Sequence, residues 1–252
     1  MKPLNVLVGY EYSAVVRDEF RKLGHNAWSC DILPTEGDPD YHYEMDIFRC
    51  LKLTKGIWDL VIFHPPCTYV CSSGLHWNKR VPGRAEKTEA ALEDVRKLFD
   101  CGVPKIVLEN PVGCISTRIR PYAQAIQPWM FGEDASKKTC LWTVGIEKKL
   151  DHTGPIIPPK GYKLVKFAAD MPQCECVGPT MDDWHYRTIE GYLFATNIVD
   201  KDGKPLHPVW ANQTPSGQNK LGPSETRGLD RAKTYLGIGR ALASQLGGQV
   251  TA

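Results

Sequence analysis

Apolar and polar residues alternate along the first half of the chain in a pattern that predicts strands followed by helices. Buried strands are predicted by short apolar runs at residues 5–8, 27–30, 58–63 and 105–108. Between these runs, apolar residues recur at helical spacing over 13–23 and 86–101. Strands that alternate with helices predict an α/β fold built on a doubly wound, mostly parallel sheet.

The pattern changes in the second half. Residues 145–209 are rich in proline and glycine, which predicts an irregular insert or small lobe with a hairpin over 198–205. A polar loop over 210–227 follows, and a helix over 229–246 is predicted to return to the core. The expected organisation is a core over 1–144, an insert over 145–209 and a returning segment over 210–252.

Side chains able to do chemistry fall where the predicted strands end. In doubly wound sheets, ligands bind beyond the carboxyl ends of the strands. The groups found there are the 9–13 turn, Asp31, Asp46, the 64–67 segment and Glu109. This agreement predicts a functional site at that edge of the sheet.

Cys67 and Glu109 are the strongest candidates for catalysis. Pro65 and Pro66 precede Cys67 and present its thiol on a stiff turn, with Thr68 beside it. A free cysteine is more often a small hydrophobic residue than a nucleophile, so Cys67 alone does not indicate catalysis. Glu109 ends the next buried strand, where a carboxylate is costly unless it is paired or functional. A thiolate and a carboxylic acid on adjacent strand ends suit addition of sulfur to C6 of a cytosine, with a proton shared at N3.

The turn after the first strand is placed for an adenosyl ligand. Only Gly9 is present from a glycine-rich phosphate loop, so a dinucleotide is not expected. Asp31 is placed to accept hydrogen bonds from ribose hydroxyls, and Asp46 to accept one from an adenine amino group. The alternative for either aspartate is a loop cap.

These motifs resemble those of the cytosine-C5 DNA methyltransferases, especially their short phage-type relatives. Pro66-Cys67 resembles the catalytic Pro-Cys motif, and Glu109-Asn110-Pro111 resembles the Glu-Asn-Val motif. The cofactor motifs of the family are matched by residues 9–13, Asp31 and Asp46-Ile47, and its final helix by 236–242. The resemblance covers about residues 6–142 and 210–246.

The resemblance implies a Rossmann-like fold and methyl transfer from S-adenosylmethionine to C5 of cytosine in DNA. It implies Cys67 as the nucleophile and Glu109 as its acidic partner, with Lys138 in place of a family arginine. The residues implied to bind the cofactor are Gly9, Tyr10, Tyr12, Ser13, Asp31, Ile32, Asp46, Ile47 and Pro65. The residues implied to contact the substrate are Pro66, Thr68, Asn110, Asn212, Ser216, Gln218, Asn219 and Lys220.

Departures from the family leave several hypotheses open. Thr68 replaces the usual Gln, the Gln-x-Arg-x-Arg motif is replaced by 136–139 or by Arg118 and Arg120, and the large target-recognition domain is absent. One hypothesis is that the substrate is DNA that is single-stranded or locally opened. The other is that the substrate is a free pyrimidine nucleotide such as dCMP. A catalytically silent relative that binds nucleic acid or cofactor, and a modified methyl donor, are further alternatives. Backbone contacts to DNA are expected from Lys79, Arg80, Arg84, Lys137 and Lys138.

Composition and charge indicate which kinds of partner and which cell compartment to expect. The net charge of +2 argues against a protein that coats nucleic acid, but it permits a local basic groove. No apolar run approaches the roughly 18 residues of a membrane span, and the first residues lack a signal-peptide core. We therefore expect a cytoplasmic protein, in the host cytoplasm if the gene belongs to a phage. The nine cysteines are scattered and predict free thiols. Cys174 and Cys176 lack the usual zinc spacing, so no metal is expected, and the sequence does not indicate an oligomeric state.

Overall fold

The computed structural model describes residues 2–167, 184–217, 219–222, 224–225 and 227–250. The chain divides into two compact units. The first comprises Met1–Gln127, Lys137–His152 and Gly228–Ala252, and the second comprises Pro128–Ser136 and Thr153–Arg227. Residues 145–152 therefore group with the first unit, and 210–227 group with the second.

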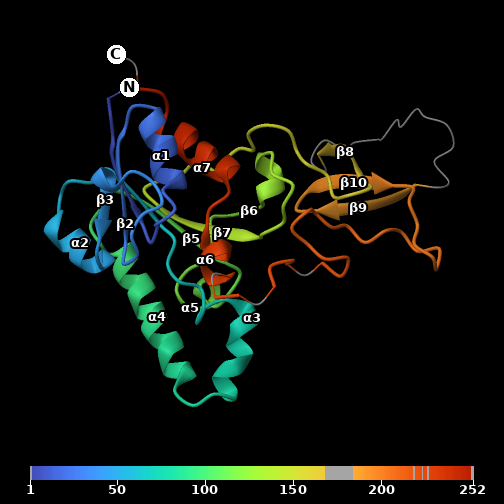
Figure 1. Ribbon diagram of the computed structural model, residues 1–252, viewed down its shortest axis with the longest axis horizontal. Coiled ribbons are helices and arrows are strands. Elements are labelled where there is room, and N and C mark those ends of the chain that lie inside the picture. Colours follow the sequence, from blue (N-terminus) through green and yellow to red (C-terminus); the bar gives the residue numbers. More distant parts are fainter. Residues whose placement is uncertain (1, 168–183, 218, 223, 226, 251–252) are drawn as a thin grey trace. The chain divides into compact units, whose positions relative to one another are not determined.

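A seven-stranded sheet forms the centre of the first unit (Figure 1). Its strands are β1 Asn5–Gly9, β2 Asn26–Asp31, β3 His42–Glu44, β4 Leu60–Phe63, β5 Lys105–Pro111, β6 Gln124–Ile126 and β7 Thr139–Val144. Their spatial order is β3-β2-β1-β4-β5-β7-β6. The first five strands in sequence are parallel, whereas β7 runs antiparallel to both β5 and β6. The predicted α/β class with a mostly parallel, doubly wound sheet is confirmed.

The strand order reverses between β1 and β4. The chain builds outward from β1 through β2 to β3, and then crosses back to add β4 and β5 on the other side. Such a switch point opens a crevice at the carboxyl ends of the two strands. Gly9 pairs with Phe63 in the register, and the His64 amide donates to the Gly9 carbonyl at 3.0 Å. The segments that follow β1 and β4 therefore begin side by side.

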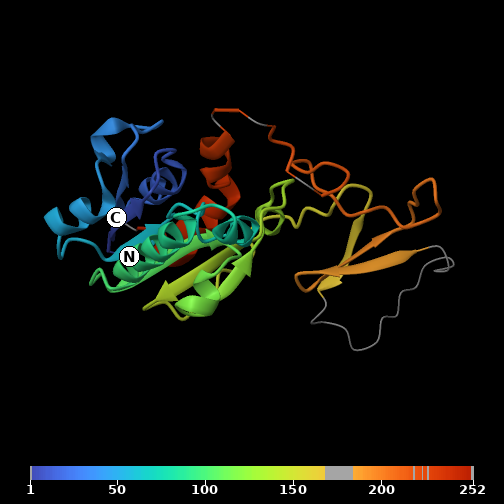
Figure 2. The same cartoon turned by 90° about the horizontal axis from the view of Figure 1, so that it is seen from below.

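Helices cover both faces of this sheet (Figures 1 and 2). The helices are α1 Val15–Lys22, α2 Ile47–Leu53, α3 Ser72–Leu75, α4 Arg84–Phe99, α5 Ile115–Arg118, α6 Arg227–Ala232 and α7 Leu236–Leu242. Shorter helical turns are η1 Pro39–Tyr41, η2 His76–Lys79, η3 Pro128–Phe131 and η6 Ala243–Gly247. Alternate strand residues such as Leu7 and Val61 share one core cluster with buried residues of α2 and α4. On the opposite face α1 and α7 lie side by side, and Gly239 permits this because a Cβ there would come within 3.3 Å of Val15.

Three segments of the first unit differ from the sequence prediction. Residues 34–43, where the sequence predicts no strand, contain η1 and the first two residues of the short edge strand β3. The strand predicted over 105–108 continues to Pro111, because residues 109–111 pair with β7. The predicted helix over 229–246 is interrupted at Tyr235, whose backbone is extended (φ −69°, ψ 139°). Thr234 and Tyr235 are β-branched and aromatic, and both are weak helix formers.

The second unit contains a three-stranded antiparallel sheet. Its strands, in the spatial order β8-β10-β9, are β8 Lys163–Phe167, β10 Tyr192–Thr196 and β9 His185–Ile189. The insert is therefore not irregular throughout, and Val199 pairs with Pro205 within the predicted hairpin. Trp129 and Trp210 stack with their ring centroids 5.5 Å apart, and Phe194 packs edge-on against Trp129. These aromatic residues form the core of this unit.

Candidate active site

The turn that carries Cys67 leaves β4 at the switch point. Pro65 is buried and Pro66 is exposed. From β5, the Asn110 Nδ2 donates a hydrogen bond to the Pro65 carbonyl at 2.8 Å. Asn110 is only 1% exposed, so a buried amide braces the turn against the neighbouring strand. The contact that the structure shows for Asn110 is thus with the turn, and its predicted role toward a substrate stays a prediction.

Cys67 has a second thiol beside it. The Cys71 amide donates to the Cys67 carbonyl at 2.9 Å, so the two residues lie one helical turn apart. The hydrogen bond that its thiol shares with Cys71, together with burial, raises the pKa of Cys67. The same bond, aided by Ser73 and by the Gly74 amide and opposed by burial, lowers the pKa of Cys71 to about 5. The negative charge of the pair therefore rests on Cys71, with the Cys67 thiol as the donor.

Glu109 is paired with a histidine that the sequence analysis did not select. The His64 Nδ1 lies 2.7 Å from the Glu109 Oε2, and the two side chains are 6% and 13% exposed. Burial favours the neutral carboxyl, but the hydrogen bond from His64, the charge of Lys137 and a hydrogen bond from Thr139 outweigh it. Together they lower the pKa of Glu109 to about 2. The carboxylate is ionised at neutral pH, so Glu109 is a hydrogen-bond acceptor and His64 is the donor.

Lys137 supplies the positive charge of the site. Its ammonium lowers the pKa of both Cys67 and Glu109, which places it within electrostatic reach of each. Lys137 is half-buried, whereas Lys138, the residue predicted for this role, is exposed. Lys137 stands two residues before Thr139, the first residue of β7, whose side chain hydrogen-bonds Glu109. The catalytic role of Lys138 remains a prediction.

The loop between β1 and α1 is closed by Glu11. Its Oε1 accepts the Val16 amide at 2.7 Å, and its Oε2 accepts the Arg17 amide at 3.1 Å. The carboxylate thus occupies the amino end of α1, the place where a dinucleotide site binds pyrophosphate. Tyr10 and Ala14 in the same loop have positive φ values of 60° and 62°. Each costs roughly 1–2 kcal/mol, so the loop is held in an unusual shape.

The predicted cofactor residues at the first strand ends divide into packed and accessible groups. A side chain at Gly9 would come within 2.7 Å of Ile47 and of Phe63, so Gly9 and the buried Ile47 serve close packing. The Asp31 Oδ1 accepts the Leu33 amide at 3.0 Å. Ile32 is 73% exposed beside Asp31, which leaves an uncovered apolar side chain at the carboxyl end of β2.

The remaining predicted cofactor residues have local partners. The exposed Asp46 caps α2, because its Oδ1 accepts the amides of Phe48 and Arg49 at 3.0 and 3.1 Å. The Tyr12 hydroxyl donates to the Leu229 carbonyl at 3.0 Å. Burial raises the pKa of Tyr10, and the charges of Asp94 and Asp46 raise it further. Ser13 is half-buried in the same loop. Cofactor contacts by these residues remain predictions.

The polar loop predicted to grip a substrate belongs to the second unit. The Asn212 side chain pairs with the backbone of Ser136, its Oδ1 accepting the amide at 2.9 Å and its Nδ2 donating to the carbonyl at 3.0 Å. The Lys220 Nζ donates to the Ala211 carbonyl at 2.7 Å. Ser216 and Asn219 make bonds to Thr214 and Leu221. Gln218 lies outside the described residues, and substrate contacts by this loop stay a prediction.

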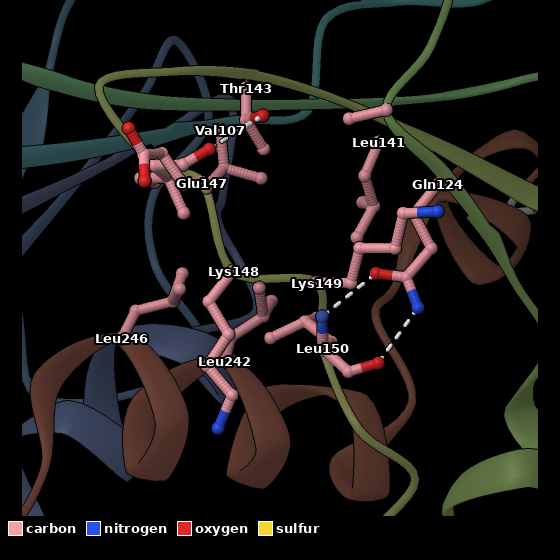
Figure 3. Close-up of a pocket in the computed structure, with 12 residues that line it drawn as sticks. Val107, Gln124, Leu141, Thr143, Glu147, Lys148, Lys149, Leu150, Leu242 and Leu246 are labelled. Atoms are coloured by element: carbon pink, nitrogen blue, oxygen red, sulfur yellow. Dashed lines mark hydrogen bonds between the residues drawn. The ribbon is translucent and has the colours of Figure 1, made fainter.

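A pocket on the α7 face lies apart from these residues (Figure 3). It has a volume of about 80 Å³ and is lined mainly by apolar side chains, with Gln124 and the Leu150 backbone joined by two hydrogen bonds at its side. None of the predicted site residues lines it. Its apolar lining includes Val107, Leu141 and Leu242, which is typical of a packing defect between a helix and a sheet.

Among the described residues, no group of three or more His, Cys, Asp or Glu side chains comes together to hold a metal ion. Cys174 and Cys176 lie outside the described residues. The seven described cysteines are free thiols. No helix in the described part of the chain has the length and apolar character needed to cross a membrane.

Comparison with known proteins finds likeness among solved structures but no match in sequence. No family model matches the sequence, and no curated protein matches it. Among solved structures, the chain is similar to a "putative DNA modification methyltransferase encoded within prophage" from E. coli, with 12% identity and a TM-score of 0.34. The match covers 56% of this chain, which spans about half of that protein (46%). A likeness of this strength does not decide what the chain does.

Proposed function

We propose that the protein transfers a methyl group from S-adenosylmethionine to C5 of cytosine in DNA. The observation that supports this most is the grouping of the Cys67–Cys71 thiols, the ionised Glu109 and Lys137 around the carboxyl ends of β4 and β5. Carbon C5 of cytosine is a poor nucleophile until sulfur adds at C6, and this grouping contains the nucleophile, an acceptor and a cation.

Each residue of this group has a separate role in the reaction. The Cys67 sulfur forms a bond to C6, and its proton passes to the Cys71 thiolate. Glu109 accepts a hydrogen bond from the N4 amino group of the base and so orients the ring, with N3 beside the carboxylate. Lys137 offsets the negative charge that gathers on the sulfur and the carboxylate. Once C5 carries the new methyl group, its original proton is lost to solvent, the bond between sulfur and C6 breaks, and Cys67 recovers its proton from Cys71.

The strand ends of β1 and β2 fit an adenosyl cofactor better than a phosphorylated one. Glu11 fills the amino end of α1 and would repel a pyrophosphate. The exposed Ile32 offers an apolar surface to an adenine ring, and Asp31 offers a carboxylate to ribose hydroxyls. S-adenosylmethionine bound there would supply an electrophilic methyl group.

The segment after Cys67 supports a nucleic-acid substrate over a free nucleotide. Trp77 is 45% exposed, and the Arg80 guanidinium lies 5.7 Å from the centre of its ring. Arg84 lies 4.9 Å from the Tyr69 ring centre and donates to the Thr68 carbonyl at 2.9 Å. Cations combined with aromatic faces are typical of surfaces that bind single-stranded nucleic acid through phosphates and base stacking.

The test offers labelled S-adenosylmethionine with duplex DNA, a single-stranded oligonucleotide or dCMP. We expect transfer to the oligonucleotides to exceed transfer to dCMP, with little preference among flanking bases and a steep loss of DNA binding as salt rises. Cys67→Ala is the matched inactive variant. Equal or better turnover of dCMP would favour the nucleotide enzyme, and cofactor binding without transfer to any of the three would favour a silent relative.

A further inference from the structure

His64 is the most deeply buried titratable side chain of the site that the chemistry above leaves without a role. It follows β4 directly, three residues before Cys67, and its amide is held by the Gly9 carbonyl at 3.0 Å. Its Nδ1 contacts the Glu109 Oε2 at 2.7 Å. Its Nε2 is buried and has no hydrogen-bond partner among the described residues. A buried nitrogen without a partner is unfavourable, so this atom points to a ligand or a proton.

Glu109 alone cannot supply the proton that the cytosine ring needs. Charge gathers on the ring when sulfur adds at C6, and a proton at N3 stabilises it. The carboxylate of Glu109 is ionised at neutral pH and holds no proton to give. An imidazole is the side chain that changes charge near neutral pH. His64 is in direct contact with Glu109, so it can fill this gap.

We infer that His64 and Glu109 act as one proton-holding pair, in which the imidazolium passes its Nδ1 proton to the Glu109 Oε2 and the carboxyl group so formed then protonates N3. The inference rests on the proposed function. As the bond between the Cys67 sulfur and C6 forms, N3 gains the proton and the imidazole becomes neutral. As that bond breaks, N3 returns the proton through the Glu109 Oε2 to Nδ1. No proton is consumed, and His64 acts through Glu109 as a positioning residue.

Two carboxyl groups lie near His64. Glu109 faces it from β5, with its Oε2 2.7 Å from the His64 Nδ1. Glu11 lies in the loop after β1, where burial raises the pKa of its carboxyl group and the charges of His64 and Arg17 oppose that rise. The charge of Lys137 acts on Glu109. The hydrogen bond to the ionised Glu109 is the direct side-chain contact of the imidazole, and it places the Nδ1 proton between the two groups.

The test measures covalent adduct formation on a single-stranded oligonucleotide containing 5-fluorocytosine, with S-adenosylmethionine, as a function of pH. We expect a bell-shaped profile in the wild type. The rate should rise as the Cys71 thiolate that accepts the Cys67 proton forms, and it should fall at higher pH as the pair loses its proton. His64→Asn keeps a donor to Glu109 but holds no transferable proton. It should remove the fall on the alkaline side and slow the reaction about a hundredfold, a common size for general acid–base catalysis.

His25→Asn is the matched control. His25 is also buried, and its two ring nitrogens are satisfied by the Leu4 amide and the Gly248 carbonyl. We expect it to lower stability while keeping the wild-type pH profile. An unchanged alkaline fall in His64→Asn would overturn the inference, and so would a loss of cofactor affinity as large as the loss of rate.

A second measurement separates this inference from the proposed function. If the wild type forms no adduct and methylates no substrate, the proposed function fails. Nuclear magnetic resonance of the histidine ring nitrogens then still reports on the pair. We expect His64 to take up a proton over the pH range in which the fold is stable, and Glu109→Gln to make that uptake harder. A ring that stays neutral throughout, or one indifferent to Glu109→Gln, would refute the pair itself.

Discussion

Replacing Glu109 with glutamine tests the electrostatics of the site without any substrate. The amide has nearly the shape of the carboxylate and can still accept a hydrogen bond from Thr139. It removes the negative charge that His64 and Lys137 stabilise. Any cost of the substitution that comes from packing is independent of pH, so the part that varies with pH reports on the charge alone.

The size and sign of that part follow from the pKa of Glu109. Folding lowers it from 4.5 to about 2, and the side chain is only 13% exposed, so solvent screens the shift little. A carboxylate with a lowered pKa stabilises the folded state above its unfolded pKa and loses this contribution as pH falls through its folded pKa. The contribution is about 3 kcal/mol at pH 7 and roughly half of that at pH 3.

Urea unfolding of both proteins between pH 7 and pH 3 measures this contribution. The difference in unfolding free energy between wild type and Glu109→Gln should shrink by about 2 kcal/mol over that range. Glu89→Gln is the control, because Glu89 pairs with Arg118 at the surface, where water screens the pair. A difference that stays constant with pH, or grows as pH falls, would show that Glu109 is not held ionised by its neighbours.

Three further variants test the other parts of the site. Cys71→Ser should slow adduct formation on Cys67 and move it to higher pH, because the thiolate that accepts the Cys67 proton is gone; a trapped adduct on Cys71 would reverse the two roles. Asp31→Ala should weaken S-adenosylmethionine binding by about 1.5–3 kcal/mol, and unchanged affinity by calorimetry would place the cofactor elsewhere. Asn110→Ala should lower the unfolding free energy by about 1–3 kcal/mol by leaving the Pro65 carbonyl without its donor, and an unchanged urea midpoint would contradict that.

The strands at the centre of the sheet could be predicted because they are buried on both faces. β4 is buried at every position, and such a run is visible in the sequence as uninterrupted apolar residues. β3 could not be predicted, because its three residues, His-Tyr-Glu, are polar or amphipathic and only partly buried. Pairing with β2 holds them in a strand, and this long-range contact leaves no periodic pattern in the sequence.

The parts of the candidate site that the sequence indicates are those with a local signal. Cys67 and Glu109 stand next to recognisable strand ends, and that signal is short-range. Lys137 stands just before β7, and its place beside Glu109 depends on the antiparallel pairing of β7 with β5. No local pattern in the sequence reveals that pairing. His64 carried a usable signal, since a histidine between a buried strand and Pro65 shares the strand end of Cys67. His64 is a titratable residue at this strand end but lies outside the motif that contains Cys67, so the motif alone does not indicate it.

Charge balance links the thiol pair to the histidine–carboxylate pair. With Cys71 as thiolate, Glu109 ionised, Lys137 charged and His64 protonated, these four groups sum to zero. Passing one proton from His64 toward the ring and one from Cys67 to Cys71 moves charge within this set without changing the total. Since isolated charges are costly where water is scarce, a site that stays neutral through each transfer avoids the desolvation that a lone carboxylate and thiolate would incur.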